Sequence, residues 1–318
     1  MLRYVLRRLL IAVPTLLAII TISFFMIRVA PGGPFDSNRK ATPEVLANLN
    51  RSFHLDEPLV KQYGRYLWGV LHLDFGPSFK YRDYTVSELI LRGFPVSLEI
   101  GLCSIAVATI FGIGLGTIAA LRQNSILDHT VMTLGMAGVA VPTFVTAPVM
   151  QLLLSVVPHD HPLHLPFGVV FSGLPTAGWG DWDQMILPIA ALSLPTIAVI
   201  ARLTRGSMIE SLRSNHVRTA RAKGIGMRRT VLHHALIGGL LPTLAFLGPA
   251  TADVITGSLV IERVFGIPGI GRFFVEAASN RDYTLVMGTV IFYGGLIIFA
   301  NLIVDLAYSV VDPKVRYD

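Results

Sequence analysis

Long apolar runs alternate with polar, charged segments along this chain of 318 residues. A helix needs about 20 apolar residues to cross a bilayer, and the range of workable lengths is broad enough to admit six runs here. The six predicted membrane spans are Leu9–Ala30, Phe94–Leu121, Thr130–Val157, Gln184–Ala201, Ala235–Val260 and Thr284–Val311. Pro142 and Pro148 lie inside the third span and predict that it is bent or broken. The pattern therefore predicts an all-α membrane protein with six transmembrane helices.

The first apolar run follows a positively charged start that contains Arg3, Arg7 and Arg8. A cleaved signal peptide has an apolar core of about 7–15 residues and a small-residue cleavage site, and this run is longer. We therefore expect a retained first helix with a cytoplasmic N-terminus. Pro14 falls in its second turn and predicts a kink.

The segment Pro31–Arg92 has a different composition, with eight Lys or Arg and seven Asp or Glu. Two short amphipathic helices are predicted within it, Pro43–Phe53 with Thr42 as N-cap and Leu59–Leu71. The apolar face of the second helix comprises Val60, Tyr63, Leu67 and Val70. A segment of about 60 residues can cross the membrane regardless of its charge, so we place it outside, folded against the membrane surface.

A dense positive block, Arg202–His234, separates the fourth and fifth spans and contains eight Lys or Arg against the single acid Glu210. Such a block is typical of a cytoplasmic loop. Apolar residues recur in it at near-helical spacing until Gly224 and Gly226, and a second short helix is predicted from Met227. Two interpretations stay open: a docking surface for a cytoplasmic partner, or a loop that only fixes topology against anionic headgroups.

The connection Pro158–Asp183 lies in a stretch, Gln123–Ala201, that contains no Lys or Arg, which indicates an outside position. It includes His159, His161 and His164. A metal site needs converging geometry and supporting partners, so we favour an ordinary polar loop over a metal site.

Composition agrees with a membrane protein, because 53% of residues are apolar and only 14% are charged, against roughly 25% in soluble domains. The net charge of +6 is concentrated at the N-terminus and in the central loop, which indicates orientation charge and argues against nucleic-acid binding. The single cysteine, Cys103, cannot form an intrachain disulfide and is expected to be a small buried apolar residue.

Catalytic chemistry is not visible in the sequence, since it contains no P-loop, no HExxH and no GxSxG. We expect no catalytic residue, no metal and no cofactor. Ionisable residues inside spans are candidates for function because their burial in hydrocarbon is costly. Glu99 and Asp253 are the candidates for a translocation pathway, although Asp253 could equally hydrogen-bond a neighbouring helix. Glu99 and Asp305 lie near span ends and could reach the interface.

The central loop also carries a family resemblance. RTARAKGIGMRR, Arg218–Arg229, followed by HHAL, resembles the coupling loop of binding-protein-dependent ABC transporter permeases, in particular the dipeptide, oligopeptide and nickel subgroup. Arg218, Thr219 and Ala220 stand at the positions of the family's EAA, and Gly224 at its glycine. Arg218 replaces the general family's acid, His234 stands at its isoleucine, and its proline is absent.

Other stretches, in the right order, resemble the B-type permease subunits of the oligopeptide group: FHLDEPLVKQYGRYL, DFGPSFKYRDYTV, VFGIPGIG, NRDYTLV and DPKVRY. The loop around Pro158–Trp182 carries no such likeness. The resemblance implies a type I importer permease divided into residues 1–30 (first helix), 31–93 (periplasmic), 94–311 (core, with the coupling loop 202–234) and 312–318 (cytoplasmic tail).

The resemblance further implies the partners and the mechanism. A homologous C-type permease subunit would complete the channel, two cytoplasmic ATPase subunits would drive it, and a periplasmic binding protein would deliver oligopeptide at a bacterial inner membrane. The residues implied in coupling are Arg218, Thr219, Ala220, Arg221, Ala222, Lys223 and Gly224. Gly224→Pro or Ala220→Glu is therefore expected to uncouple uptake. Alternative cargoes are dipeptides, glutathione, nickel or haem, and a different class of function is an ion-coupled secondary carrier.

Overall fold

The computed structural model describes residues 2–29, 44, 51, 53–81, 83–164, 166 and 170–311. The chain forms two compact units, each of which gathers segments that are distant in sequence. Unit 1 comprises Met1–Ser97, Pro268–Leu302 and Arg316–Asp318, and unit 2 comprises Leu98–Ile267 and Ile303–Val315.

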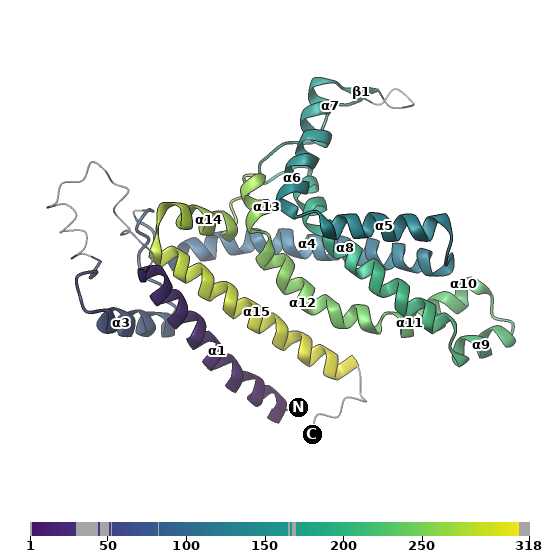
Figure 1. The fold of residues 1–318 in the computed structure, drawn as a ribbon, viewed down its shortest axis with the longest axis horizontal. Coiled ribbons are helices and arrows are strands. Elements are labelled where there is room, and N and C mark those ends of the chain that lie inside the picture. Colours follow the sequence, from purple (N-terminus) through teal and green to yellow (C-terminus); the bar gives the residue numbers. More distant parts are fainter. Residues whose placement is uncertain are drawn as a thin grey trace. The chain divides into compact units, whose positions relative to one another are not determined.

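The described part of unit 1 contains five helices or parts of helices (Figure 1). They are α1 (Leu2–Val29), α3 (Leu59–Leu71), the first part of α4 (Val86–Leu121), α14 (Ile270–Asn280) and most of α15 (Tyr283–Val311). Helices α1 and α15 run side by side, and a Cβ added at Gly294 would lie 3.0 Å from Cδ1 of Ile19. Helix α3 packs on α1 through the Phe24 and Tyr63 rings, whose centroids are 5.2 Å apart.

Unit 2 holds the end of α15, from Ile303, and the remaining described elements, most of them helical. They are the rest of α4, α5 (Ile126–Ala140), α6 (Thr143–Gln151), the π-helix η1 (Leu152–Val156), α7 (Val157–Asp160), β1 (Leu163–His164), β2 (Val170–Phe171), α8 (Trp182–Leu212), α9 (Asn215–Ala222), α10 (Met227–Thr230), the π-helix η3 (Val231–Ala235), α11 (Leu236–Gly239), α12 (Leu241–Gly257) and α13 (Leu259–Val264). The two strands pair antiparallel, with Leu163 opposite Phe171.

The predicted all-α membrane fold is confirmed. Within the described residues, five helices are long and apolar enough to cross a membrane, and a bent pair of helices supplies a sixth span if it is counted as one. That pair is α5 with Thr143–Asp160, and the two parts are bent by 106° at Val141 and Pro142. Because Pro142 has no amide hydrogen to continue the α5 ladder, the predicted break in the third span falls at this proline.

The second span begins earlier than the sequence pattern indicated. Helix α4 starts at Val86 rather than at Phe94. The reason is a reciprocal cap: the Glu88 amide donates to Oγ1 of Thr85 at 3.2 Å, and the Thr85 amide donates to Oε2 of Glu88 at 2.9 Å. This capping box nucleates the helix ahead of the apolar run. The polar segment that precedes the second span is correspondingly shorter.

Two further span boundaries also differ. Helix α8 continues to Leu212, so the fourth span does not end at Ala201 and the first third of the predicted loop Arg202–His234 is helix. The predicted fifth span, Ala235–Val260, is divided among α11, α12 and α13, with breaks at Leu240 and Ser258. Pro242, at the start of α12, explains the first break, since proline suits the first helical turn better than the interior.

The remaining elements largely follow the sequence pattern. Helix α3 has the predicted bounds, and α15 begins one residue before the predicted sixth span. Helix α1 is continuous through Pro14. The face of α3 turned to the protein differs, because Gln62 is buried and Val60 is exposed. The predicted helix Pro43–Phe53 lies almost wholly outside the described residues.

Two glycines of the FGIGLG run bring α4 against α8. A Cβ at Gly116 would lie 2.5 Å from the carbonyl oxygen of Ala201, and one at Gly112 would lie 2.6 Å from Cγ2 of Ile200. Gly114, between them, faces open space. Small residues four apart thus allow close backbone contact, as in other membrane helix pairs.

Gly116→Ala is expected to destabilise the protein by about 1–3 kcal/mol, because the carbonyl oxygen of Ala201 must move. Gly114→Ala is the matched control and should be neutral or stabilising by up to about 1 kcal/mol, since alanine is the better helix former. Thermal unfolding of the detergent-solubilised variants would measure both. Equal melting temperatures would show that the α4–α8 contact tolerates an added methyl group.

Candidate functional site

The basic block resolves into a helical hairpin at the end of α8 (Figure 1). Helix α8 ends at Leu212, Arg213 and Ser214 form the turn, and α9 runs from Asn215 to Ala222. Hydroxyl Oγ of Ser214 donates to the carbonyl oxygen of Ser211 at 2.5 Å, which occupies one carbonyl of the α8 terminus. The helical spacing that continues across this block in sequence therefore belongs to two helices, not one.

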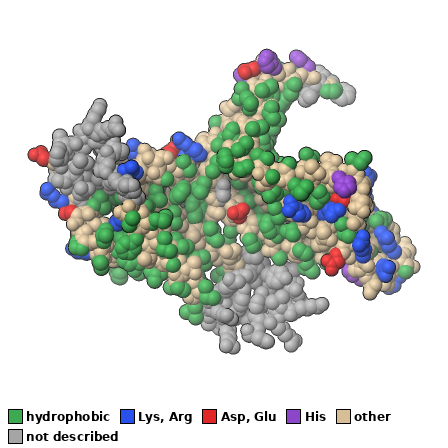
Figure 2. Space-filling model, viewed as in Figure 1, with side chains coloured by type: hydrophobic (Ala, Val, Ile, Leu, Met, Phe, Trp, Pro, Cys, Tyr) green, Lys and Arg blue, Asp and Glu red, His purple; other side chains and the backbone are tan. Residues whose placement is uncertain are grey.

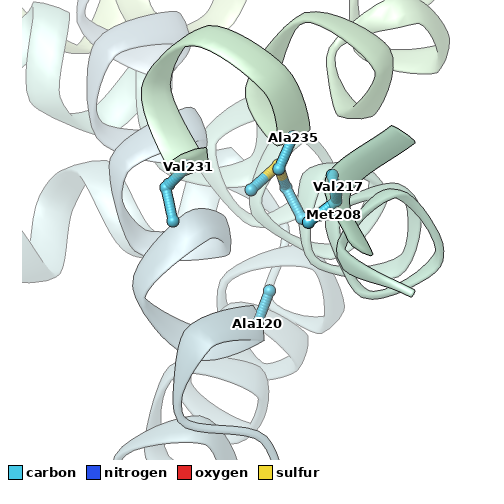
Figure 3. Close-up of a cluster of buried hydrophobic side chains, with 5 residues drawn as sticks. All are labelled: Ala120, Met208, Val217, Val231 and Ala235. Carbon is cyan, nitrogen blue, oxygen red and sulfur yellow. The ribbon is translucent and has the colours of Figure 1, made fainter. Parts of the chain in front are cut away.

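A small apolar core holds α9 against its neighbours (Figure 3). Its buried members come from four elements: α4, α8, α9 and η3. They are Ala120, Met208, Val217, Val231 and Ala235. Val217 is the contribution of α9, and Ala220 lies one turn further along the same helix, 5% exposed. These two positions form the face of α9 that packs against the rest of the protein.

Gly224 closes α9 with a specific backbone motif. The amide of Gly224 donates to the carbonyl of Arg221 at 2.9 Å, and the amide of Ile225 donates to the carbonyl of Ala220 at 3.2 Å. This pair of bonds is a Schellman motif, which needs a left-handed residue after the helix. Gly224 has φ of +78°, so a residue with a side chain would be strained there.

The opposite face of α9 is exposed and basic. Among the residues that the sequence singled out, the exposed ones are Arg218, Thr219, Arg221, Ala222, Lys223 and Gly224. Figure 2 shows Lys and Arg side chains gathered over the region of α9 and α10, where Arg213, Arg228 and Arg229 are also exposed. We call Arg218, Thr219, Arg221, Ala222 and Lys223 the exposed face of α9. Ala220 is the one predicted contact residue that points into the protein.

Gly224→Ala is expected to cost about 1–2 kcal/mol of local stability, because alanine is disfavoured in the left-handed region. A Cβ there would meet no atom within 4 Å, so the cost is backbone strain alone. Gly226→Ala is the matched control: its surroundings are equally open and its φ is −59°. Hydrogen exchange of the α9 amides would measure the difference, and equal protection in the two variants would contradict the role of φ.

The return segment η3–α11 is tied to the end of α8 by serine hydroxyls. Oγ of Ser211 donates to the carbonyl of Ala235 at 2.7 Å, and Oγ of Ser207 donates to the carbonyl of Gly239. Ala235 is the last residue of the π-helix η3, and Gly239 is the last residue of α11. These two hydrogen bonds therefore fix the return segment to helix α8.

A buried ion pair between α5 and α8 was not predicted from the sequence. Nε of Arg205 donates to Oδ1 of Asp128 at 2.5 Å, and NH2 of Arg205 donates to Oδ2 at 2.7 Å. The Asp128 side chain is 1% exposed and that of Arg205 is 25% exposed. A bidentate, charge-assisted pair of this kind fixes α5 against α8 with a defined geometry.

The two pathway candidates lie on neighbouring helices of unit 2. Glu99 is on α4 and Asp253 on α12, and both are exposed in the isolated chain. The helices meet close by, where a Cβ at Gly101 would lie 2.6 Å from Cγ1 of Ile255. This arrangement leaves both carboxylates available to a water-filled passage or to a partner subunit. The side chain of the third acid, Asp305, lies outside the described part of the chain.

The remaining candidates lie outside this site. Within the described residues, no group of three or more His, Cys, Asp or Glu could hold a metal ion. His159 lies in α7, His161 directly follows α7, and His164 lies in β1. Cys103 is a free, half-buried cysteine.

Two family models cover almost the whole chain. The model described as binding-protein-dependent transport system inner membrane component matches residues 112–317, and the corresponding N-terminal model matches residues 1–101.

Curated relatives match over the full length. The chain is 51% identical to the oligopeptide transport system permease protein OppB of Escherichia coli (strain K12), over 100% of both chains. It is 49% identical to OppB of Haemophilus influenzae, also over 100% of both, and 41% identical to the dipeptide permease DppB of Bacillus subtilis, over 99% of this chain and 98% of the relative.

A solved structure shares the fold. It is described as the crystal structure of an amino acid ABC transporter with histidines. The similarity covers 70% of this chain and 94% of that one, with a TM-score of 0.52 at 13% sequence identity.

Proposed function

Because this chain belongs to the family of binding-protein-dependent transport system inner membrane components, we propose that it is one half of the channel of an ATP-driven oligopeptide importer. Members of this family are non-catalytic permeases that cross the inner membrane several times, and so is this chain. The observation that carries the proposed cargo is the 51% identity to a permease named for oligopeptides, over the full length of both proteins.

Coupling to ATP hydrolysis is assigned to the exposed face of α9 and to Gly224. The exposed cations Arg218, Arg221 and Lys223 provide a positive surface that suits an acidic cleft on a cytoplasmic ATPase subunit. Ala220 contributes indirectly. It packs inward, and its small side chain sets the distance between α9 and the apolar core. Two ATPase subunits would dock in this way, one on this chain and one on a homologous C-type permease subunit.

The physical connection from α9 to the membrane supports this mechanism. Closure of the ATPase cleft would move α9, and its apolar core would carry the movement to α8, η3 and α4. The serine bonds from Ser207 and Ser211 would make the return segment follow. Transport requires that ATP binding stabilise one of two arrangements of the spans more than the other, and a rigid hairpin transmits that difference.

The passage for the peptide is assigned to the neighbouring helices α4 and α12, which carry Glu99 and Asp253. Two exposed carboxylates on membrane helices are costly in contact with lipid and suit a watery passage. A periplasmic binding protein would deliver peptide to the outside end of this passage. Both chain termini would then be cytoplasmic, in line with the positive charge of Arg3, Arg7 and Arg8.

The test of this function is ATP hydrolysis by the complex that co-purifies with the chain, reconstituted in lipid with its binding protein. We expect a pool of tetra- to hexapeptides to stimulate hydrolysis severalfold. Stimulation by dipeptides but not by longer peptides would favour the second candidate, a dipeptide importer, which the 41% identity to DppB of Bacillus subtilis supports. Absence of any co-purifying ATPase would contradict the whole proposal.

A further inference from the structure

A cavity of about 270 Å³ lies within unit 1 at the end of α1. Helix α3, the segments before and after it and the start of α15 complete its walls. Its polar lining includes Arg28, Gln62 and Tyr66, and its apolar lining includes Met287. None of these residues belongs to the α9 hairpin or to the pathway candidates.

Arg28 enters this cavity with an incomplete set of partners. Its Nε and NH2 atoms both donate to Oε1 of Gln62, at 3.1 and 3.0 Å, and its guanidinium carbon lies 3.7 Å from the centre of the Phe24 ring. Within the described residues, its NH1 atom contacts the sulfur of Met287, at 3.9 Å. Among the residues that the structure describes, no carboxylate forms a salt bridge with Arg28. A guanidinium has five donors in a planar fork, so an oxyanion would complete it.

Tyr66 provides a second donor in the cavity wall. Its hydroxyl is buried and has no hydrogen-bond partner within the described residues. Burial raises the pKa of the Tyr66 phenol, so this hydroxyl keeps its proton at neutral pH and can donate. An unpaired buried hydroxyl costs free energy, which a bound acceptor would recover.

The surroundings indicate that the cavity opens at the membrane interface. Arg28 is the penultimate residue of the candidate span Leu10–Val29. On α3, Val60, Trp68 and Leu71 are 80%, 67% and 71% exposed, and the charged Lys61 lies beside this apolar stripe. An amphipathic helix with tryptophan and cations at its polar edge is typical of the headgroup region of a bilayer.

We propose that this cavity binds the headgroup of a membrane phospholipid, with the phosphate held by Arg28 and Tyr66. Asp74 also lines the cavity, and we assign it to the ammonium group of an ethanolamine-type headgroup. The phosphate supplies the oxyanion that the NH1 edge of Arg28 lacks. The bound lipid anchors α3 to the end of α1. This site depends on the membrane position of unit 1 and not on the transported cargo, so it can fail or hold independently of the proposed function.

The test measures phospholipid retained by the intact complex, purified from nanodiscs that contain phosphatidylethanolamine and analysed by native mass spectrometry. Tyr66→Phe removes one donor, and Arg28→Gln removes the cation. A hydrogen bond to a charged group contributes enough that each variant is expected to retain the lipid at least about tenfold more weakly. Tyr63→Phe is the matched control, because its hydroxyl bonds to Oγ1 of Thr21 at 2.7 Å and lies outside the cavity lining.

Two results would overturn the assignment. Equal retention by the parent complex and by Tyr66→Phe would show that the hydroxyl meets no lipid, even if Arg28→Gln failed to fold. Displacement of the lipid by a tri- to pentapeptide pool, with the same dependence on Arg28 and Tyr66, would assign the cavity to a peptide carboxylate instead. Loss of retention in both variants, with Tyr63→Phe unchanged and peptides without effect, would establish the phospholipid site.

Discussion

Asp128→Ala is expected to lower the free energy of unfolding by about 3 kcal/mol, the low end of the range for breaking a buried ion pair. The substitution leaves Arg205 without its carboxylate at a position where 25% of the side chain reaches solvent. That partial exposure is why the low end applies. Asp128→Ala also removes the acceptor for the amide of Asn124, at 2.9 Å, in the turn that precedes α5. Thermal unfolding of the solubilised chain, followed by intrinsic fluorescence, would measure the change.

Two comparisons separate the ion pair from general damage. Replacing both partners, Asp128→Leu with Arg205→Met, should recover most of the loss, because a well-packed apolar pair is often as stable as a buried ionic one. Glu57→Gln removes the acid of a more exposed cluster with Lys61 and Arg65, and it should cost much less stability than Asp128→Ala. If Asp128→Ala were as mild as Glu57→Gln, burial would not be strengthening the Asp128 pair.

The spans were predictable because the bilayer imposes a length on every apolar run, and that length is visible in one dimension. Their ends were less predictable. The start of α4 depends on a bond between Thr85 and Glu88, a local signal that was present in the sequence as TVSE. The apolar run masked this signal, since hydropathy alone places the boundary at the first long uncharged stretch.

Arg205 shows a different reason for failure. It belongs to a cluster of cations, and charge density alone indicated a loop. Its partner Asp128 is 77 residues away, in the first helical turn of α5. Only the tertiary contact between α5 and α8 reveals that the two charges neutralise each other. A cation at the end of a membrane helix can therefore be a structural residue rather than part of a docking surface.

Within the candidate site, the break at Gly224 was predictable, because a glycine after a helical run commonly marks its end. Which side chains face outward was not. Ala220 and Ala222 are equally small and lie two positions apart, yet one is buried and the other exposed. The turn at Arg213 and Ser214 sets which side chains of α9 face the protein. A helical spacing that is continued across this turn does not predict that orientation.

This difference makes Ala220→Glu and Ala222→Glu a paired test of packing against docking. Ala220→Glu forces a carboxylate into the space beside Val217, and we expect α9 to lose about 3 kcal/mol of local stability from overpacking and desolvation together. Ala222→Glu places the same group in solvent and should leave the stability of α9 within about 0.5 kcal/mol. The exposed arginines and lysine make limited trypsin digestion a direct probe of α9 opening.

Peptide uptake then separates the two roles. Both variants are expected to reduce uptake at least tenfold, but for different reasons: Ala220→Glu because α9 unfolds, and Ala222→Glu because a negative charge replaces a neutral contact on a positive face. Only Ala220→Glu should accelerate cleavage by trypsin, and both chains should still reach the membrane. Normal uptake by Ala222→Glu with an intact α9 would move the docking surface away from the exposed face of α9. The exposed cations of α10, Arg228 and Arg229, would then be the next positions to test.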